Sequence, residues 1–137
     1  MTSPIAAYAM TLVLFVAIDL VWLMGPGRPF YVAEIGSLLR GQPNLPAAIA
    51  FYMLYAFGLC YFAVMPGFKA GLPWQALVQG ALLGLIAYAT YDLTNLAVVN
   101  GFTTRIALID MFWGSLLSGA VAWACCRALL ALGMAQA

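Results

Sequence analysis

Histidine is absent from this chain of 137 residues, and charged residues make up only 7% of it. Without histidine the chain cannot form a histidine-ligated haem, the common histidine-containing zinc sites, or a Ser-His-Asp or Cys-His catalytic arrangement. The three cysteines show no C-x-x-C spacing, and two of them are adjacent. We interpret them as small apolar packing residues, and we expect neither a metal nor a cofactor.

Clusters of basic residues are missing as well. Five Lys and Arg residues stand against four Asp and Glu residues, so the formal net charge is only +1. This balance argues against nucleic acid or an anionic surface as a partner. Hydrophobic residues make up 66% of the chain and the mean hydropathy is +1.04, whereas about a quarter of a soluble domain is charged. We conclude that this is an integral membrane protein in contact with membrane lipid.

Four apolar segments each approach the length of about 20 residues that a bilayer core requires. They run over about 4–24, 45–65, 73–99 and 106–126, and breaker sequences containing glycine or proline separate them at 25–29, 41–46, 65–73 and 100–105. Because a backbone in lipid must satisfy its own hydrogen bonds, we predict helices. The first segment contains an aspartate and lacks a basic leader, so we interpret it as a retained span.

Residues 30–40 carry apolar side chains at near-helical spacing, which predicts a short helix at the membrane interface with aromatic anchors. The fold class is therefore all-α, a membrane four-helix bundle with a short interfacial helix between spans one and two. We expect one domain over 1–137.

The orientation follows from the charges beside the spans. An even number of spans places both termini on one side of the membrane. Arg28, Arg40 and Arg105 fall in the loops of the opposite side, against Lys69 and Arg127 on the terminal side. The positive-inside rule therefore favours cytoplasmic loops and external termini, in what we expect to be a bacterial inner membrane.

Three aspartates lie inside these apolar segments. Asp19 and Asp92 stand near the ends of spans one and three, and Asp110 stands near the start of span four. Because neighbouring spans run in opposite directions, all three should lie on the order of 7 to 12 Å below one membrane face. Mutual repulsion predicts that at least one of them, Asp92 as the deepest, holds a proton, or that one pairs with Arg28 or Arg105.

Two short sequences repeat a pattern around two of these aspartates. "IDLVW" at 18–22 and "IDMFW" at 109–113 both read I-D-x-x-W. Residues three apart share a helix face, so the pattern predicts that Trp22 and Trp113 each lie beside the aspartate of their own helix. We interpret the two motifs as similar corners of one site.

Span three carries small and polar residues along one helical face. Gly80 and Gly84 at its deep end predict close contact with another helix, and Tyr88, Tyr91, Asp92 and Asn95 follow at its shallow end. The candidate ligand-binding residues are Asp19, Trp22, Tyr52, Tyr55, Tyr88, Tyr91, Asp92, Asn95, Arg105, Asp110 and Trp113. The alternative for each aspartate is an ordinary hydrogen bond between helices or, for Asp110, an interaction with the helix dipole.

Several motifs also resemble a known family. They are "IDLVW", the "FY" pairs at 30–31 and 51–52, "MP" at 65–66, "GLIAYATYDLTNL" at 84–96 and "IDMFWG" at 109–114. Together they resemble the small bacterial four-span proteins grouped as domain of unknown function 2177. The resemblance implies a four-helix membrane fold and assigns no catalytic or binding role.

Three classes of function remain open. In the first, the aspartates and tyrosines form a pocket near one leaflet that binds or transports a small amphipathic or cationic molecule or a proton. Because four helices are few for a transport path, a transporter would require a homodimer. In the second, the protein is an accessory or assembly subunit of a larger membrane complex. In the third, it is a lipid-modifying enzyme with an aspartate as general acid or base, whose catalytic residues the sequence does not identify.

Overall fold

The computed structural model describes residues 3–134, and within that range the chain is helical with no strand. Four helical stretches are long and apolar enough to cross a membrane: α1 (Ser3–Met24), the stretch Leu45–Ala70, α5 (Pro73–Val98) and α6 (Thr104–Ala131). The short helix α2 (Arg28–Ile35) and a 3₁₀ turn (Gly36–Leu38) lie between the first two. The predicted all-α membrane bundle with a short helix between spans one and two is thereby confirmed.

The second span is built from three successive pieces. They are α3 (Leu45–Leu59), a π-helical turn (Cys60–Val64) and α4 (Met65–Ala70). The second span therefore extends past its predicted end at about residue 65, because the helix continues through Pro66 and turns only at Gly71, within the predicted break at 65–73, where φ is 71°. A proline would clash with the preceding turn of a regular helix, and the wider π turn just before it, closed by the Met65 N–H on the Cys60 carbonyl, relieves that clash.

Side-chain caps fix the start of two spans. The Asn44 side chain accepts a hydrogen bond from the Ala47 N–H at 3.2 Å, directly before α3. Thr103 does the same for the Ile106 N–H at 3.2 Å, directly before α6. Each cap satisfies a backbone donor that the first turn of a helix leaves open.

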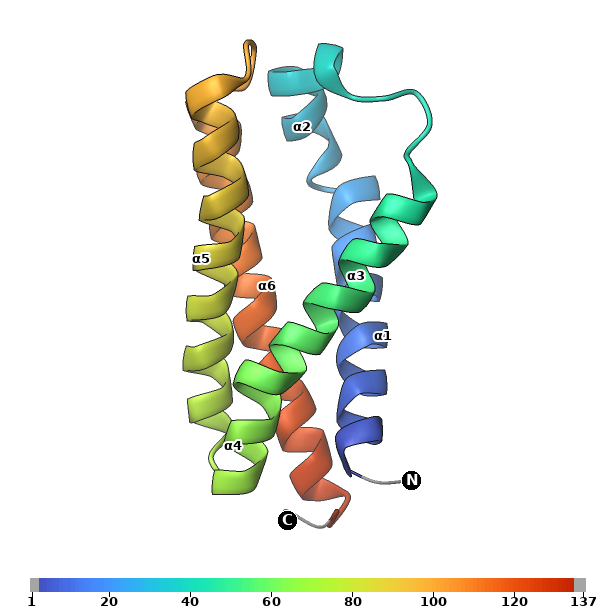
Figure 1. Cartoon of the computed structure of the whole chain (residues 1–137), viewed down its shortest axis with the longest axis vertical. Coiled ribbons are helices and arrows are strands. Elements are labelled where there is room, and N and C mark those ends of the chain that lie inside the picture. Colours follow the sequence, from blue (N-terminus) through green and yellow to red (C-terminus); the bar gives the residue numbers. More distant parts are fainter. Residues whose placement is uncertain (1–2, 135–137) are drawn as a thin grey trace.

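The four spans are not parallel along their whole length. Figure 1 shows α1, α5 and α6 running lengthwise, while α3 crosses obliquely and diverges from α5 towards the end that α2 covers. The start of α1 and the end of α6 lie together at the opposite end. The tilt of α3 thus separates the bundle into a tightly packed half and a more open half.

Helices α5 and α6 pack at backbone distance. A Cβ added at Gly84 would lie 2.5 Å from the Gly114 carbonyl oxygen, and one added at Gly80 would lie 2.7 Å from the Ser118 carbonyl oxygen. Only glycine permits this approach. The small face predicted for span three is therefore in contact with α6.

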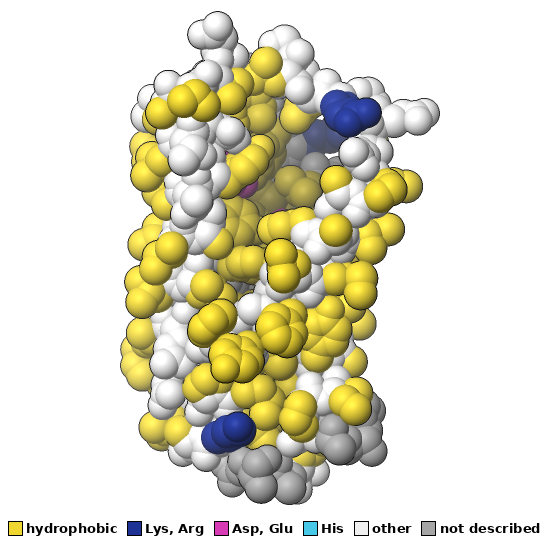
Figure 2. Space-filling view, viewed as in Figure 1, with side chains coloured by type: hydrophobic (Ala, Val, Ile, Leu, Met, Phe, Trp, Pro, Cys, Tyr) yellow, Lys and Arg dark blue, Asp and Glu magenta, His cyan; other side chains and the backbone are white. Residues whose placement is uncertain are grey.

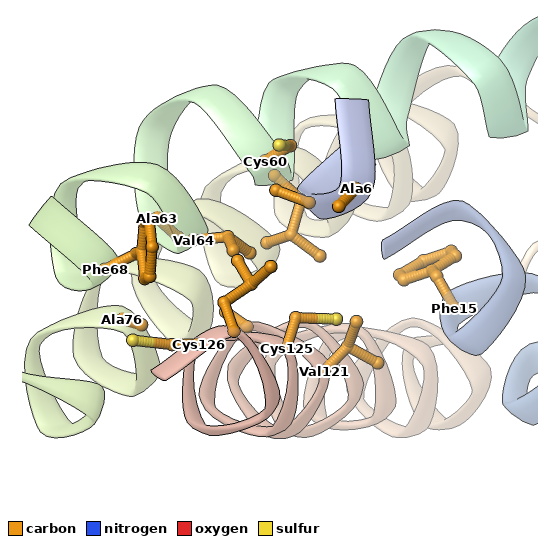
Figure 3. Close-up of a cluster of buried hydrophobic side chains, with 14 of the residues drawn as sticks. Ala6, Phe15, Cys60, Ala63, Val64, Phe68, Ala76, Val121, Cys125 and Cys126 are labelled. Carbon is orange, nitrogen blue, oxygen red and sulfur yellow. The ribbon is translucent and has the colours of Figure 1, made fainter. Parts of the chain in front are cut away.

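An apolar core fills the half of the bundle near the chain ends. It includes Phe15, Val64, Phe68 and Val121, all fully buried, and Figure 3 shows these side chains between the helices, with Phe68 and Phe15 towards opposite ends of the cluster. The three cysteines are free and buried in the same cluster. They act there as small apolar residues, as interpreted from their spacing.

Candidate functional site

A cavity of about 560 Å³ occupies the other half of the bundle, where α3 diverges from α5. Residues from α1, α2, α3, α5 and α6 line it, with Phe102 from the loop before α6. Phe51 on α3 and Tyr91 on α5 belong to this lining and are also exposed on the outer surface, at 44% and 58%. Figure 2 shows the hollow between these two helices, with an acidic side chain visible in its depth. The cavity therefore opens sideways, between α3 and α5.

All three aspartates of the chain line this cavity. Asp19 is 5% exposed, Asp92 is fully buried and Asp110 is 9% exposed. They come from α1, α5 and α6, so three helices each contribute one carboxyl group. None of the five Lys and Arg residues of the chain lines the cavity. Its polar wall is accordingly acidic.

Asp19 is held by two hydrogen bonds from other helices. Its Oδ2 accepts from the Tyr52 hydroxyl on α3 at 2.6 Å, and its Oδ1 accepts from the Trp113 indole N–H on α6 at 3.0 Å. Both oxygens thus have a donor, as buried carboxylates require. Asp19 ties α1 to α3 and α6 at the rim of the apolar core.

Asp110 receives its hydrogen bond from the short helix α2. The Tyr31 hydroxyl donates to Asp110 Oδ1 at 2.6 Å, and the same hydroxyl accepts from the Trp22 indole N–H at 3.2 Å. Burial, reinforced by the adjacent Asp110 carboxylate, raises the pKa of Tyr31 well above its usual value. The Tyr31 hydroxyl therefore keeps its proton and remains a donor over the physiological pH range.

The two I-D-x-x-W motifs are connected crosswise. Trp113 of α6 donates to Asp19 of α1, while Trp22 of α1 reaches Asp110 of α6 through Tyr31. The two indole rings stack on each other at 4.5 Å between centroids and 15° between planes. Each indole thus bonds towards the aspartate of the other helix, because the side chains of these antiparallel helices interleave at the contact.

Asp92 differs from the other two aspartates. It is fully buried, yet neither carboxyl oxygen has a hydrogen-bond partner among residues 3–134. Tyr88, Tyr91 and Asn95 of the same helix do not donate to it. The group beside it is the carboxyl of Asp110. Two neighbouring carboxyl groups repel when both are ionised.

The predicted pairing of an aspartate with Arg105 was wrong. Its Nε lies 3.8 Å from Glu34 Oε1, and its side chain is 70% exposed. Glu34 lies on α2, and neither Glu34 nor Arg105 belongs to the cavity lining. This surface ion pair contributes little to stability, and it leaves the acidic wall without a neutralising cation.

The remaining predicted residues divide into lining and supporting groups. Tyr52, Tyr55, Tyr88 and Tyr91 line the cavity together with the aspartates. Tyr55 also shares a hydrogen bond of 2.7 Å with the Ser118 hydroxyl, and its ring lies 6.1 Å from that of Tyr88. The predicted residues outside the lining are Trp22, Asn95, Arg105 and Trp113, of which the two tryptophans hold the hydrogen-bond network behind it.

Tyr31 is the polar residue of the site that the sequence did not identify. We interpreted it as an interfacial anchor, whereas it donates directly to Asp110. Its place beside Phe30, in one of two "FY" pairs, was the available signal, since Tyr52 of the second pair bonds the other aspartate. The apolar lining that was not singled out comprises Leu23, Ile35, Leu39, Ala48, Phe51, Ala87, Phe102 and Ile106.

Comparison with known proteins identifies a family and no characterised relative. A family model described as "Predicted membrane protein (DUF2177)" matches residues 4–127. No curated protein and no solved structure matches the chain. Among residues 3–134, no group of three or more potential ligand side chains is arranged to hold a metal ion.

Proposed function

The chain belongs to the DUF2177 family of predicted membrane proteins, and from this premise we propose that it binds a small amphipathic cation in the cavity between α3 and α5. One observation carries the proposal: three of the four acidic side chains of the protein line a single cavity that no basic side chain lines. An acidic wall attracts a cation and repels an anion.

The shape and chemistry of the cavity favour a ligand with an apolar part. Its volume of about 560 Å³ lies in the range of pockets that enclose small molecules. Apart from the aspartates, its lining consists of aromatic and aliphatic side chains, which would hold a hydrocarbon chain. Tyr52, Tyr55 and Tyr88 add ring faces that attract cations. The sideways opening gives such a ligand a route from the lipid.

The same geometry bears on the alternative functions. A purely structural role accounts for Asp19, whose two oxygens are bonded to other helices. It does not account for Asp92, a fully buried carboxyl group that bonds to no donor within residues 3–134. The packed apolar core closes the other half of the bundle. This supports a binding site that opens in one half of the membrane, and it argues against a continuous transport path through the bundle.

The proposal is tested by binding of octylammonium to the protein in lipid nanodiscs, with empty nanodiscs subtracted and octyl sulfate as the anion of equal chain length. We expect octylammonium to bind and octyl sulfate not to bind. Asp110→Asn should weaken octylammonium binding at least about tenfold, or about 1.4 kcal/mol, because it removes a cavity charge. Glu34→Gln is the matched control, since Glu34 is the one acidic residue outside the lining.

Two results would contradict the proposal. One is equal binding of octylammonium and octyl sulfate, which would indicate partition into lipid and no acidic site. The other is an Asp110→Asn variant that is folded and binds octylammonium as tightly as the Glu34→Gln control does.

A further inference from the structure

The pair formed by Asp92 and Asp110 carries an inference about how the cavity recognises its ligand, and it rests on the proposed function. Asp92 is fully buried and both of its oxygens have no donor among the described residues. Its neighbour Asp110 is bonded through Oδ1 to the Tyr31 hydroxyl. Buried carboxyl oxygens are normally bonded, so this pair offers acceptor positions that the protein itself does not fill.

We infer that the Asp92 and Asp110 pair is a proton-exchange site, which holds one proton before binding and releases it when the ammonium group of an amphipathic amine takes its place. The exchange balances in charge, because one cation enters the pair as one proton leaves. A primary ammonium also brings three N–H donors. These donors would satisfy the open oxygens of Asp92, which a quaternary ammonium cannot do.

The surrounding groups assign the released proton to this pair. Asp19 on α1 has both oxygens occupied by donors from Tyr52 and Trp113, so an incoming ammonium gains little there. The tyrosine hydroxyls that line the cavity with the pair keep their protons near neutral pH, since tyrosine titrates at about 10; they belong to Tyr31 on α2, Tyr52 and Tyr55 on α3, and Tyr88 and Tyr91 on α5. The basic groups on the same helix as Asp110 are Arg105, which is exposed and paired with Glu34, and Arg127, which lies over the Trp123 ring towards the other end of α6.

The position of the pair also explains why a proton is the suitable counter-charge. Two ionised carboxyl groups side by side would repel in a setting with little water, and one proton between them removes that repulsion. A bound ammonium removes it equally well. The proton and the ligand therefore compete for one place, and binding should weaken as the pH falls.

The experiment counts protons. Octylammonium is titrated calorimetrically into the wild-type protein in nanodiscs at one neutral pH, in phosphate and in Tris, whose ionisation enthalpies differ. We expect release of about one proton per ligand bound. Asp92→Asn keeps the size of the side chain and cannot hold the proton, so the release should fall towards zero while weaker binding remains. Glu34→Gln should release as many protons as the wild type.

The outcomes separate this inference from the proposed function. Octylammonium binding to the wild-type protein without proton release would overturn the inference and leave the proposed function standing. An Asp92→Asn variant that releases as many protons as the wild type would also overturn it. If the Asp92→Asn variant does not fold, the same comparison is made with Asp110→Asn. The number of protons that the wild-type protein releases is a test by itself. Absence of octylammonium binding to the folded wild-type protein would overturn both.

Discussion

At the scale of single residues, the three aspartates differ in their hydrogen-bond partners although they line one cavity. Asp19 has a donor for each oxygen and joins α1, α3 and α6. Asp110 has a donor from α2, and Asp92 has none among residues 3–134. A carboxylate whose oxygens accept hydrogen bonds from the protein stabilises the fold, whereas unbonded oxygens make no such contribution. Substitutions around Asp19 should therefore affect stability first.

Tyr52→Phe tests that division. The substitution removes the hydroxyl that donates to Asp19 Oδ2 and leaves a buried carboxylate oxygen without a partner. We expect the free energy of unfolding in detergent to fall by about 1 to 2 kcal/mol, the upper range of hydrogen bonds between membrane helices. Tyr61→Phe is the control, because the Tyr61 side chain is 62% exposed. Equal stability of the two variants would show that the Tyr52 bond contributes nothing.

At the scale of helices, the cavity depends on two kinds of packing. Glycines bring α5 and α6 into backbone contact, which fixes Asp92 and Asp110 side by side on neighbouring helices. The tilt of α3 does the opposite and opens the space beside them. The crosswise bonds of the two I-D-x-x-W motifs hold α1 against α6 behind the cavity. The site thus forms where α3 diverges from an otherwise closely packed bundle.

Gly84→Ala tests the close contact between α5 and α6. The added Cβ would lie 2.5 Å from the Gly114 carbonyl oxygen and 2.7 Å from the Ser118 Cβ, so the two helices must move apart. We expect a loss of about 1 to 3 kcal/mol in the free energy of unfolding, the usual cost of overpacking. Octylammonium binding should weaken as well, because the Asp92 and Asp110 pair would separate.

Gly58→Ala is the matched control for that substitution. Gly58 also lies within a membrane helix, and a Cβ added there meets nothing within 4 Å. Alanine has the higher helix propensity, so stability should stay equal or rise by up to about 1 kcal/mol. A Gly84→Ala variant as stable as Gly58→Ala would contradict the contact between α5 and α6.

At the scale of the whole molecule, the bundle has two unlike halves. The half near the chain ends is filled by the apolar core, and the half covered by α2 contains the acidic cavity. Arg28, Arg40 and Arg105 belong to the end of the cavity, and Lys69 and Arg127 to the other end. The positive-inside rule then predicts that the cavity lies in the cytoplasmic leaflet.

Labelling with a membrane-impermeant maleimide tests this orientation. Lys69→Cys should be labelled in intact cells, whereas Gly41→Cys, at an open position before α3, should be labelled only after lysis. The wild type is the control, because its three cysteines are buried. The reverse pattern would place the cavity in the external leaflet, and labelling of both variants in intact cells would contradict a membrane crossing by the stretch Leu45–Ala70.

The sequence by itself determined the helical spans and their alternation. Lipid offers no hydrogen bonds to a backbone, so apolar segments of sufficient length must be helical whatever surrounds them. Alternating direction then brings Asp19, Asp92 and Asp110 towards one end of the bundle, which follows from counting residues along each helix. The close contact of the glycine face of α5 with another helix could likewise be predicted, because small residues at helical spacing are typical of such contacts.

Only the tertiary structure decided which donor reaches which carboxyl group. The rotation and tilt of each helix determine these contacts, and in an almost uniformly apolar span no amphipathic pattern fixes the rotation. For this reason the Trp22 indole donates to the Tyr31 hydroxyl, which in turn donates to Asp110, and Arg105 pairs with Glu34 on α2. Asp92 remains without a donor within residues 3–134. The oblique course of α3, which opens the cavity beside it, depends in the same way on packing between segments far apart in the chain.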